Sequence, residues 1–299
     1  AGTLGAQADW SSPLAMNLAG AGVAIKAADA SDVAANIALS GTLSGSNGLT
    51  KAGAGTLALS GTNTFTGTVT LNGGTLSVTS DAGLGDAANA IAIPTTTSTL
   101  AAVGAVTTAR AITVGAGVEA TFAGLAATDG LTITGTVGGD GGVAVAGQGM
   151  VTLAAANTYA GNTTVQSGTL VAANTTDSAT STGAVNVAAG ALGGDGSVGG
   201  AVTVAAGGGL RPGAVTPSSS AVGDLATGPL TLAGGSLWYT EFASAASYDV
   251  ASVGGNLQTS GASPANPVWV DLRVVNSAGK WTTPGTYAII QYAGSFTGN

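Results

Sequence analysis

An internal repeat restricts the fold of this 299-residue chain more than any other feature of its sequence. Residues 53–78 read GAGTLALSGTNTFTGTVTLNGGTLSV, and residues 147–172 read GQGMVTLAAANTYAGNTTVQSGTLVA. The copies align without a gap at an offset of 94 residues, and residues 41–52 and 135–146 lead into them at the same offset. Apolar and small or polar residues alternate in runs of three to five, separated by glycine or asparagine. This period of two predicts short β-strands in nearly the whole chain.

One copy of the repeat is too short to fold alone, because it buries too few aliphatic side chains to offset the entropy lost on ordering. Stacking would supply the missing burial if each strand paired with equivalent strands about 4.8 Å above and below it. The repeat therefore predicts a parallel β-helix, in which 94 residues make four or five turns. A β-sandwich or propeller would show more hairpin signals, and only Asn47-Gly48 and Asn72-Gly73 qualify.

The composition excludes several classes of function. The chain has no histidine and no cysteine, which removes histidine-dependent triads, most zinc sites, disulfides and thiolate chemistry. Its net charge of −8, with six scattered cations, argues against a nucleic-acid partner. We therefore predict no catalytic, cofactor or metal site. We also expect neither a signal peptide nor a membrane anchor here, since the apolar residues 13–25 are interrupted and lack a basic flank.

The two copies resemble the passenger-associated repeat of bacterial autotransporters, the proteins of type V secretion. That repeat has the pattern G-x-G-x-L-x-L-x-G-x-N-x-[FY]-x-G, which residues 53–67 match. The carboxyl-terminal third is similar to the region that precedes the translocator barrel in the same family. Residues 208–213 (GGLRPG), 230–241 and 285–290 (GTYAII) carry this second similarity.

The resemblance implies a passenger at the cell surface or outer membrane of a Gram-negative bacterium, or secreted from it. We therefore expect an all-β chain: a right-handed parallel β-helix stalk over residues 1–200, then a carboxyl-terminal β cap, the autochaperone, over 201–299. The implied partner is the protein's own outer-membrane β-barrel, and a host surface, extracellular matrix or a second copy are further candidates.

The distribution of aromatic residues points to the same division. Nine of the thirteen aromatic residues lie between Trp238 and Phe296. Aromatic side chains bury large areas, so they suit a cap that gains no burial from a further turn. The resemblance implies that this cap folds first and templates the aliphatic turns before it.

The candidate residues are all predicted to serve structure and folding. Asn63 and Asn157 should turn inward at tight corners, with Phe65 and Tyr159 stacked inside the coil. In the cap, Arg211 is expected to pair with a carboxylate, for which Glu241 is a candidate. The remaining candidates come from the cap motifs and its aromatic residues: Leu210, Pro212, Gly213, Leu237, Trp238, Glu241, Trp269 and Tyr287.

Two other functions stay open at this point. Carboxylates are the one plausible catalytic group left, and β-helices often carry polysaccharide-binding or polysaccharide-degrading sites. Asp140 and Asp195 share a Gly-Gly-Asp-Gly context, but their separation is out of phase with the repeat, so we interpret them as solvated turn residues. The third function is self-association between cells through polar ladders. We favour a non-catalytic stalk or adhesin scaffold.

Overall fold

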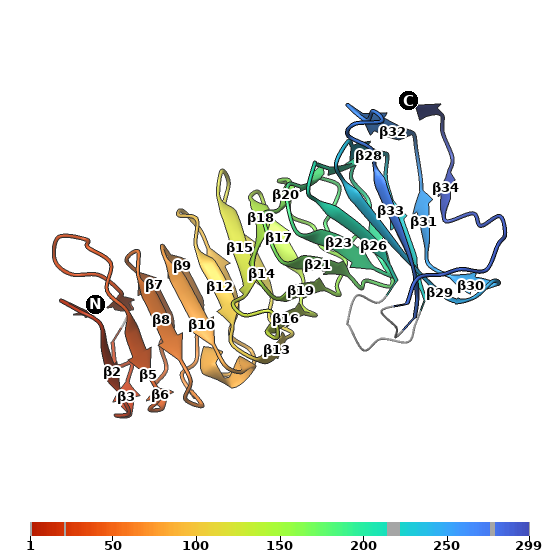
Figure 1. The fold of residues 1–299 in the computed structure, drawn as a ribbon. Helices are drawn as coiled ribbons and strands as arrows, with labels where there is room; N and C mark the ends of the chain where they lie inside the picture. Colours follow the sequence, from red (N-terminus) through yellow and green to blue (C-terminus); the bar gives the residue numbers. More distant parts are fainter. Residues whose placement is uncertain (1, 21, 214–221, 276–278, 299) are drawn as a thin grey trace. The chain divides into compact units, whose positions relative to one another are not determined.

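A computed structural model describes residues 2–20, 22–213, 222–275 and 279–298. In these ranges the chain forms 35 short β-strands and a single 3₁₀ turn, η1 (Asp81–Leu84), without an α-helix (Figure 1). The all-β prediction is therefore confirmed. No helix of the described part has the length and apolar character needed to cross a bilayer. The chain divides into two compact units, residues 1–151 with 159–161 and residues 152–158 with 162–299.

Unit 1 is a parallel β-solenoid whose strands are contributed one per sheet by each turn. Its first sheet contains, in order, β1 (Thr3–Gly5), β4 (Val23–Lys26), β7 (Leu49–Ala52), β9 (Val69–Asn72), β11 (Ile91–Ile93), β14 (Ile112–Val114) and β17 (Val137–Gly139). Its second sheet contains β2 (Trp10–Ser12), β5 (Ile37–Leu39), β8 (Thr56–Leu59), β10 (Thr75–Val78), β12 (Thr99–Ala102), β15 (Glu119–Gly124) and β18 (Gly142–Gly147).

The third face of unit 1 is less regular. It contains the pair β3 (Met16–Asn17) and β6 (Leu43–Ser44), and farther along the chain β13 (Ala105–Thr108), β16 (Gly130–Ile133) and the start of β19 (Met150–Leu153). The strands of the second sheet lie side by side from β5 to β15 in Figure 1.

Unit 2 is likewise a parallel solenoid. One sheet contains β20 (Thr163–Val165), β22 (Val185–Val187), β25 (Val202–Val204), β28 (Leu230–Ala233), β32 (Leu257–Ser260) and β35 (Phe296–Thr297). A second contains β21 (Thr169–Ala172), β23 (Ala191–Gly194), β26 (Gly209–Pro212) and β29 (Leu237–Ser244), and β29 pairs with β33 (Trp269–Val274). A third contains β24 (Ser197–Val198), β27 (Asp224–Thr227), β31 (Val250–Val253) and β34 (Ile290–Tyr292).

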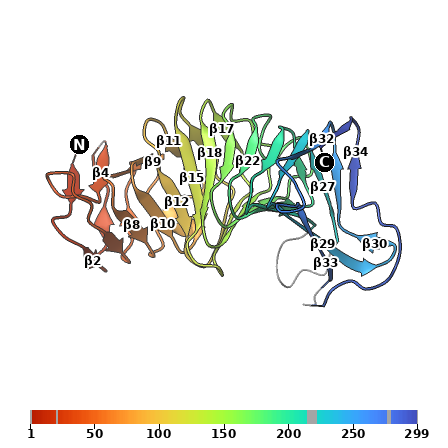
Figure 2. The same ribbon diagram turned by 45° about the horizontal axis from the view of Figure 1, so that its top comes forward.

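Among the described strands of unit 2, the parallel pattern is interrupted by a hairpin, and a few isolated antiparallel bridges lie outside the strands. The end of β29 pairs antiparallel with β30 (Ser247–Tyr248), and this hairpin is labelled in Figure 2. Parallel turns continue past residue 200 as far as β35. The parallel solenoid is thus confirmed, while the right hand of the coil and a boundary at residue 200 stay predictions.

Columns of aliphatic side chains, stacked turn upon turn, form the core. In the second sheet of unit 1, one column runs through Leu57, Leu76, Leu100, Phe122 and Val145, all fully buried. Burial alternates along β8, as the period-two pattern predicts, but on the following strands Ser77, Ala101, Ala123 and Ala144 are buried as well. Apolar alternation therefore predicts the core column, whereas small residues on the other face of several strands are also buried.

The first strands of the two repeat copies lie on different faces of the coil: β8 belongs to the second sheet and β19 to the third face. The four turns between Leu57 and Val145 take 19, 24, 22 and 23 residues. Val151, the counterpart of Leu57 in the second copy, lies six residues farther on, in β19 of the third face. The offset of 94 residues thus corresponds to four turns plus one face, because turn length varies along the chain.

Candidate functional site

The asparagine that both repeat copies share is Asn63 in the first copy, where it joins three successive turns at a corner. Its side-chain Oδ1 accepts a hydrogen bond from Leu43 N in the turn before, at 2.7 Å. Its Nδ2 donates to Gly83 O in the turn after, also at 2.7 Å. Asn63 is buried and Phe65, two residues on, is fully buried. The amide therefore satisfies backbone groups that a corner would leave unpaired inside the coil.

Asn157 holds the equivalent corner in the second copy. Its Nδ2 donates to Ala179 O at 2.6 Å, and its backbone N–H donates to Ser178 O. Asn157 is buried, and Tyr159 is fully buried despite its hydroxyl. Both asparagines and both aromatic rings thus lie inside the coil, where the sequence placed them, and their contribution to folding stays a prediction.

In unit 2, a buried carboxylate draws together three segments of the chain. Asp249 Oδ1 accepts from Gly223 N at 2.9 Å, and Oδ2 accepts from Glu241 N at 2.8 Å. Gly213, at φ +85°, lies so close that a Cβ there would come within 2.3 Å of Asp249 Oδ1. Burial raises the pKa of Asp249 to about 6, against the lowering effect of its two backbone hydrogen bonds. We call this arrangement the Asp249 clamp.

Sequence reasoning missed the Asp249 clamp. The sequence motif marks Gly213 but assigns no role to Asp249. The two residues whose backbone N–H groups bond Asp249, Gly223 and Glu241, lie 26 and 8 positions before it in the chain. The available signal was a lone carboxylate beside the apolar strand that starts at Val250. A buried acid in such a place needs hydrogen-bond donors, which only the fold identifies.

Four aromatic rings pack together next to the Asp249 clamp. Phe242 is fully buried and stacks on Tyr248 and Trp281, with ring centroids 5.0 and 4.8 Å away. Tyr287 meets Phe242 edge-on at 4.9 Å. Such contacts stabilise beyond the area that they bury. We call Phe242, Tyr248, Trp281 and Tyr287 the aromatic cluster.

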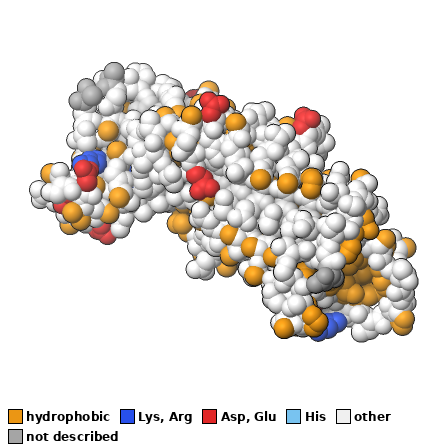
Figure 3. All heavy atoms as spheres, turned by 90° about the horizontal axis from the view of Figure 1, so that it is seen from above, with side chains coloured by type: hydrophobic (Ala, Val, Ile, Leu, Met, Phe, Trp, Pro, Cys, Tyr) orange, Lys and Arg blue, Asp and Glu red, His pale blue; other side chains and the backbone are white. Residues whose placement is uncertain are grey.

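The other predicted residues of the cap divide between core and surface. Leu210 and Trp238 are paired neighbours in β26 and β29 and are fully buried, and Pro212 is buried beside them. Leu237 is half-buried, whereas its strand partner Trp269 is 60% exposed. Val270, Tyr292 and Phe296 are also about half exposed. Figure 3 shows apolar side chains gathered in a hollow at the end of unit 2 where the last strands lie.

Arg211 does not form the expected ion pair with Glu241. Among the described residues, the ion pairs join Lys26 to Asp32, Arg110 to Asp81 and Arg273 to Asp271. The Arg211 guanidinium instead lies over the ring of Tyr239, 4.3 Å from its centroid. Burial raises the pKa of Glu241, and Arg273 and Arg211 act in the opposite direction. Glu241 therefore interacts with both arginines through space.

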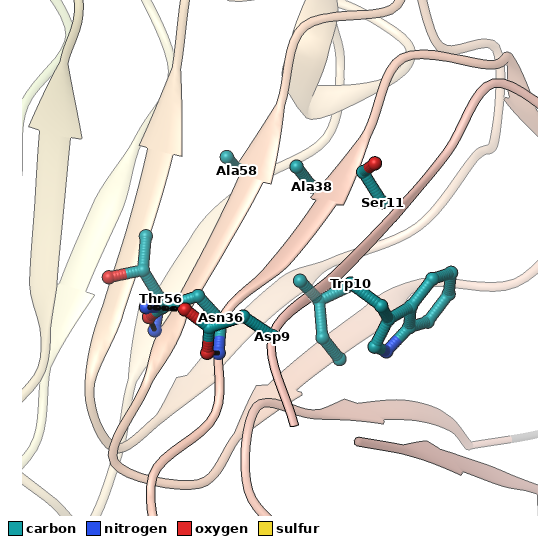
Figure 4. A pocket seen from close by; sticks show the side chains of 8 residues that line it. Asp9, Trp10, Ser11, Asn36, Ala38, Thr56 and Ala58 are labelled. Atoms are coloured by element: carbon teal, nitrogen blue, oxygen red, sulfur yellow. Dashed lines mark hydrogen bonds between the residues drawn. The ribbon is translucent and has the colours of Figure 1, made fainter. Parts of the chain in front are cut away.

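A groove on the outer face of unit 1 is one place that could hold a saccharide chain. It has a volume of about 560 Å³ and crosses β2, β5 and β8 (Figure 4). Asp9 accepts two hydrogen bonds from Asn36, at 2.7 and 3.0 Å, and Asn36 accepts one from Thr56 N at 2.9 Å. These bonds lower the pKa of Asp9. The polar side chains thus form a ladder that links successive turns.

The contents of this groove disfavour sugar hydrolysis. Trp10 points to the opposite side of its strand from Ser11, so its ring is not a stacking platform for a ligand in the groove (Figure 4). Asp9 is the sole carboxylate among the lining residues, whereas glycoside hydrolysis takes two. Asp140 lies in an exposed bend of unit 1. Asp195 is also exposed, and with Asp177 and Asp224 it lines a separate pocket of about 600 Å³ in unit 2. In the described part, no group of three acidic side chains is placed to hold a metal.

The geometry so far defines a class: a parallel β-solenoid built from glycine-punctuated repeats, with interior asparagine corners and an aromatic-rich last section. A family model described as a passenger-associated-transport-repeat matches residues 49–78 and 144–172. A segment of 55 residues is 56% identical to part of the adhesin BmaC autotransporter of Brucella suis biovar 1 (strain 1330). That segment covers 18% of this chain and 2% of the relative. Together, the repeats, the relative and the fold support an autotransporter passenger domain.

Proposed function

We propose that this chain is a non-catalytic adhesive scaffold, exposed on the surface of a Gram-negative bacterium or secreted from it. The repeats and the solenoid support a passenger, and the name of the partial relative, an adhesin, supports adhesion. A coil with one side chain per 4.8 Å on each face offers a long, regular surface without needing a catalytic pocket. Its partners are then the protein's own outer-membrane barrel and a host surface or matrix.

We further propose that residues 201–299 fold first and act as an autochaperone for a right-handed stalk over 1–200. The observation that carries this proposal is the aromatic cluster with the Asp249 clamp, because no comparable set of stacked rings occurs in the described turns of unit 1. Early strong contacts in one region would offer a paired edge to later turns, which gain little burial alone. A region that folds first outside the membrane would also oppose back-sliding during export.

Truncation tests this order of folding. Without residues 201–299, the remaining chain should fail to refold from urea, whereas removal of residues 1–120 should leave a soluble, protease-resistant core. Circular dichroism during refolding and limited proteolysis read out both changes. If residues 1–200 refold alone and residues 121–299 do not, folding starts elsewhere and the autochaperone proposal is wrong.

Self-association is a second candidate, favoured by one specific observation. In unit 2, outward polar side chains stack in register on consecutive strands: Thr164, Asn186, Thr203, Thr231 and Gln258. Hydroxyls and amides at one per turn could bond to the same ladder on another copy. Sedimentation at increasing concentration distinguishes a self-associating ladder from a monomeric scaffold.

A further inference from the structure

A small depression on the outer face of unit 2 has an unusual lining. It lies over β21, β23, β26 and β29 and has a volume of about 180 Å³. Four of its nine lining residues are glycines, so much of its floor is bare backbone, and Thr169 and Leu237 also line it. Arg211 is the only charged residue that lines it. We call it the Arg211 depression.

Arg211 differs from the chain's other cations, all of which lie in the described part. Lys26, Arg110 and Arg273 have carboxylate partners, and Lys51 donates to two carbonyls. Lys280 is exposed to solvent. The half-buried Arg211 donates no side-chain hydrogen bond to any described residue, and its Nε is buried without a partner. A partly desolvated guanidinium with free donors is a site that lacks its acceptor.

The position of the Arg211 side chain is set by contacts that leave its N–H groups unused. Its guanidinium carbon lies over the Tyr239 ring, and the Arg273 guanidinium carbon lies 5.3 Å from the centroid of the same ring. Stacking of this kind holds the plane of an arginine while its edge stays available for a bidentate acceptor. The charges of both arginines act to lower the pKa of the Glu241 carboxyl, but Glu241 forms no ion pair with Arg211 in the described part.

We propose that the Arg211 depression binds the carboxylate of an acidic sugar, a uronic or sialic acid unit of a glycan. The carboxylate would accept two hydrogen bonds from the Arg211 guanidinium, the geometry that arginine favours. The depression holds the volume of about six waters at ~30 Å³ each, which suits one sugar ring rather than an oligosaccharide. The ring would lie on the glycine floor, with Thr169 near its hydroxyls. This proposal rests on the adhesive function and specifies a ligand for it.

Two variants of the full 299-residue chain test the proposal from different sides. Arg211→Gln removes the charge, and Gly209→Ala adds a methyl to the floor. A Cβ at Gly209 would meet its neighbours at 3.4–3.7 Å, including Tyr239 Cε2, so the alanine fits without strain. Lys280→Gln is the matched control, since it makes the same charge change on an exposed residue outside the depression. Thermal unfolding by circular dichroism checks that each variant is folded.

Titration calorimetry and saturation-transfer NMR with glucuronic acid, N-acetylneuraminic acid, glucose and inorganic phosphate give the readout. We expect one of the two acids to bind, with affinity reduced roughly tenfold or more by Arg211→Gln and clearly by Gly209→Ala, and unchanged by Lys280→Gln. Glucose should not bind. The proposal is overturned if neither acid binds, if Arg211→Gln leaves binding intact, or if phosphate binds as well as the acids. Adherence of the wild-type chain to host cells after removal of acidic sugars would retain the adhesive function while rejecting this ligand.

Discussion

At the scale of single residues, the interior of the coil tolerates polar groups only where backbone atoms meet them. Lys51 is the clearest case: it occupies a core column between Ile25 and Leu71 and is fully buried. Its Nζ donates to Gly53 O at 2.5 Å and to Gly73 O at 2.7 Å. Burial lowers the pKa of Lys51 to about 8. A neutral amine retains two N–H donors, enough for both carbonyls.

Lys51 predicts a pH-dependent stability. Its pKa is about 8 when folded and near 10.5 when unfolded, so the unfolded chain binds more protons between these values. The contribution to the free energy of unfolding is therefore full above pH 10.5 and is lost as pH falls through 8, by roughly 3 kcal/mol. Urea unfolding from pH 7 to 10.5 should show this rise in wild type and lose it in Lys51→Met.

Lys26→Met is the control for this measurement, because the Lys26 ammonium is partly exposed and paired with Asp32. It should keep the wild-type rise. The assignment fails if Lys51→Met and wild type have the same pH dependence of stability.

Gly213 gives a second prediction at this scale. Gly213→Ala adds backbone strain, because φ is +85°, and a clash with Asp249 Oδ1. Gly207 has a similar φ of +82° but open space around a Cβ, so Gly207→Ala adds strain alone. We expect Gly213→Ala to lower the free energy of unfolding by about 2 kcal/mol more than Gly207→Ala, measured by urea unfolding. Equal losses would show that Asp249 shifts at little cost.

At the scale of elements, most strands are held by backbone hydrogen bonds to the equivalent strands of adjacent turns. Irregular segments lack these bonds and are held by side-chain hydrogen bonds instead. The segment around η1 is fastened by Arg110, which is buried. Its Nε and Nη2 bond the Asp81 carboxylate at 2.8 and 3.0 Å, and Nη2 also donates to Gly85 O at 2.9 Å. Nη1 donates to the carbonyls of Asp86 and Asn89. The hydrogen bonds of one guanidinium thus hold this segment, which lacks the backbone hydrogen bonds between paired strands.

Replacing that guanidinium should release the segment. Arg110→Met leaves the Asp81 carboxylate and several carbonyls unpaired, which we expect to cost roughly 3 kcal/mol. Hydrogen exchange of residues 81–90 should accelerate while the flanking strands β10 and β11 stay protected. Arg273→Met is the control, since its half-exposed pair with Asp271 should contribute less than about 1 kcal/mol. Unchanged exchange at 81–90 would show that backbone contacts alone hold the segment.

At the scale of the whole molecule, the proposed order of folding assigns different kinetic roles to two buried rings of the same type. Phe242 belongs to the aromatic cluster, and Phe65 lies in the first repeat copy. Alanine at either position should cost about 3–5 kcal/mol of stability. We expect Phe242→Ala to slow refolding and Phe65→Ala chiefly to speed unfolding, measured by stopped-flow circular dichroism. The reverse pattern would place the first-folding region in unit 1.

Much of the fold was predictable because the coil is built from local rules. Alternation of apolar and small residues predicted the strands and the core column from Leu57 to Val145, but not the burial of Ser77 and Ala101 beside it. Asparagine between two such runs marked the corners at Asn63 and Asn157. Nine clustered aromatic residues marked the last section, although Trp269 faces outward there. Sequence alone did not reveal that the two repeat copies open on different faces, since turn lengths vary.

The sequence by itself determined an all-β solenoid and its passenger-type repeats, because strand period and repetition are properties of neighbouring residues. Only the tertiary structure decided which polar groups meet: Lys51 with two carbonyls, Asp249 with two distant amides, and Arg211 with Tyr239 rather than Glu241. The physical reason is that burial cost depends on partners brought in from other turns. Those partners lie at sequence distances set by variable turn lengths, which a single sequence does not encode as a pattern.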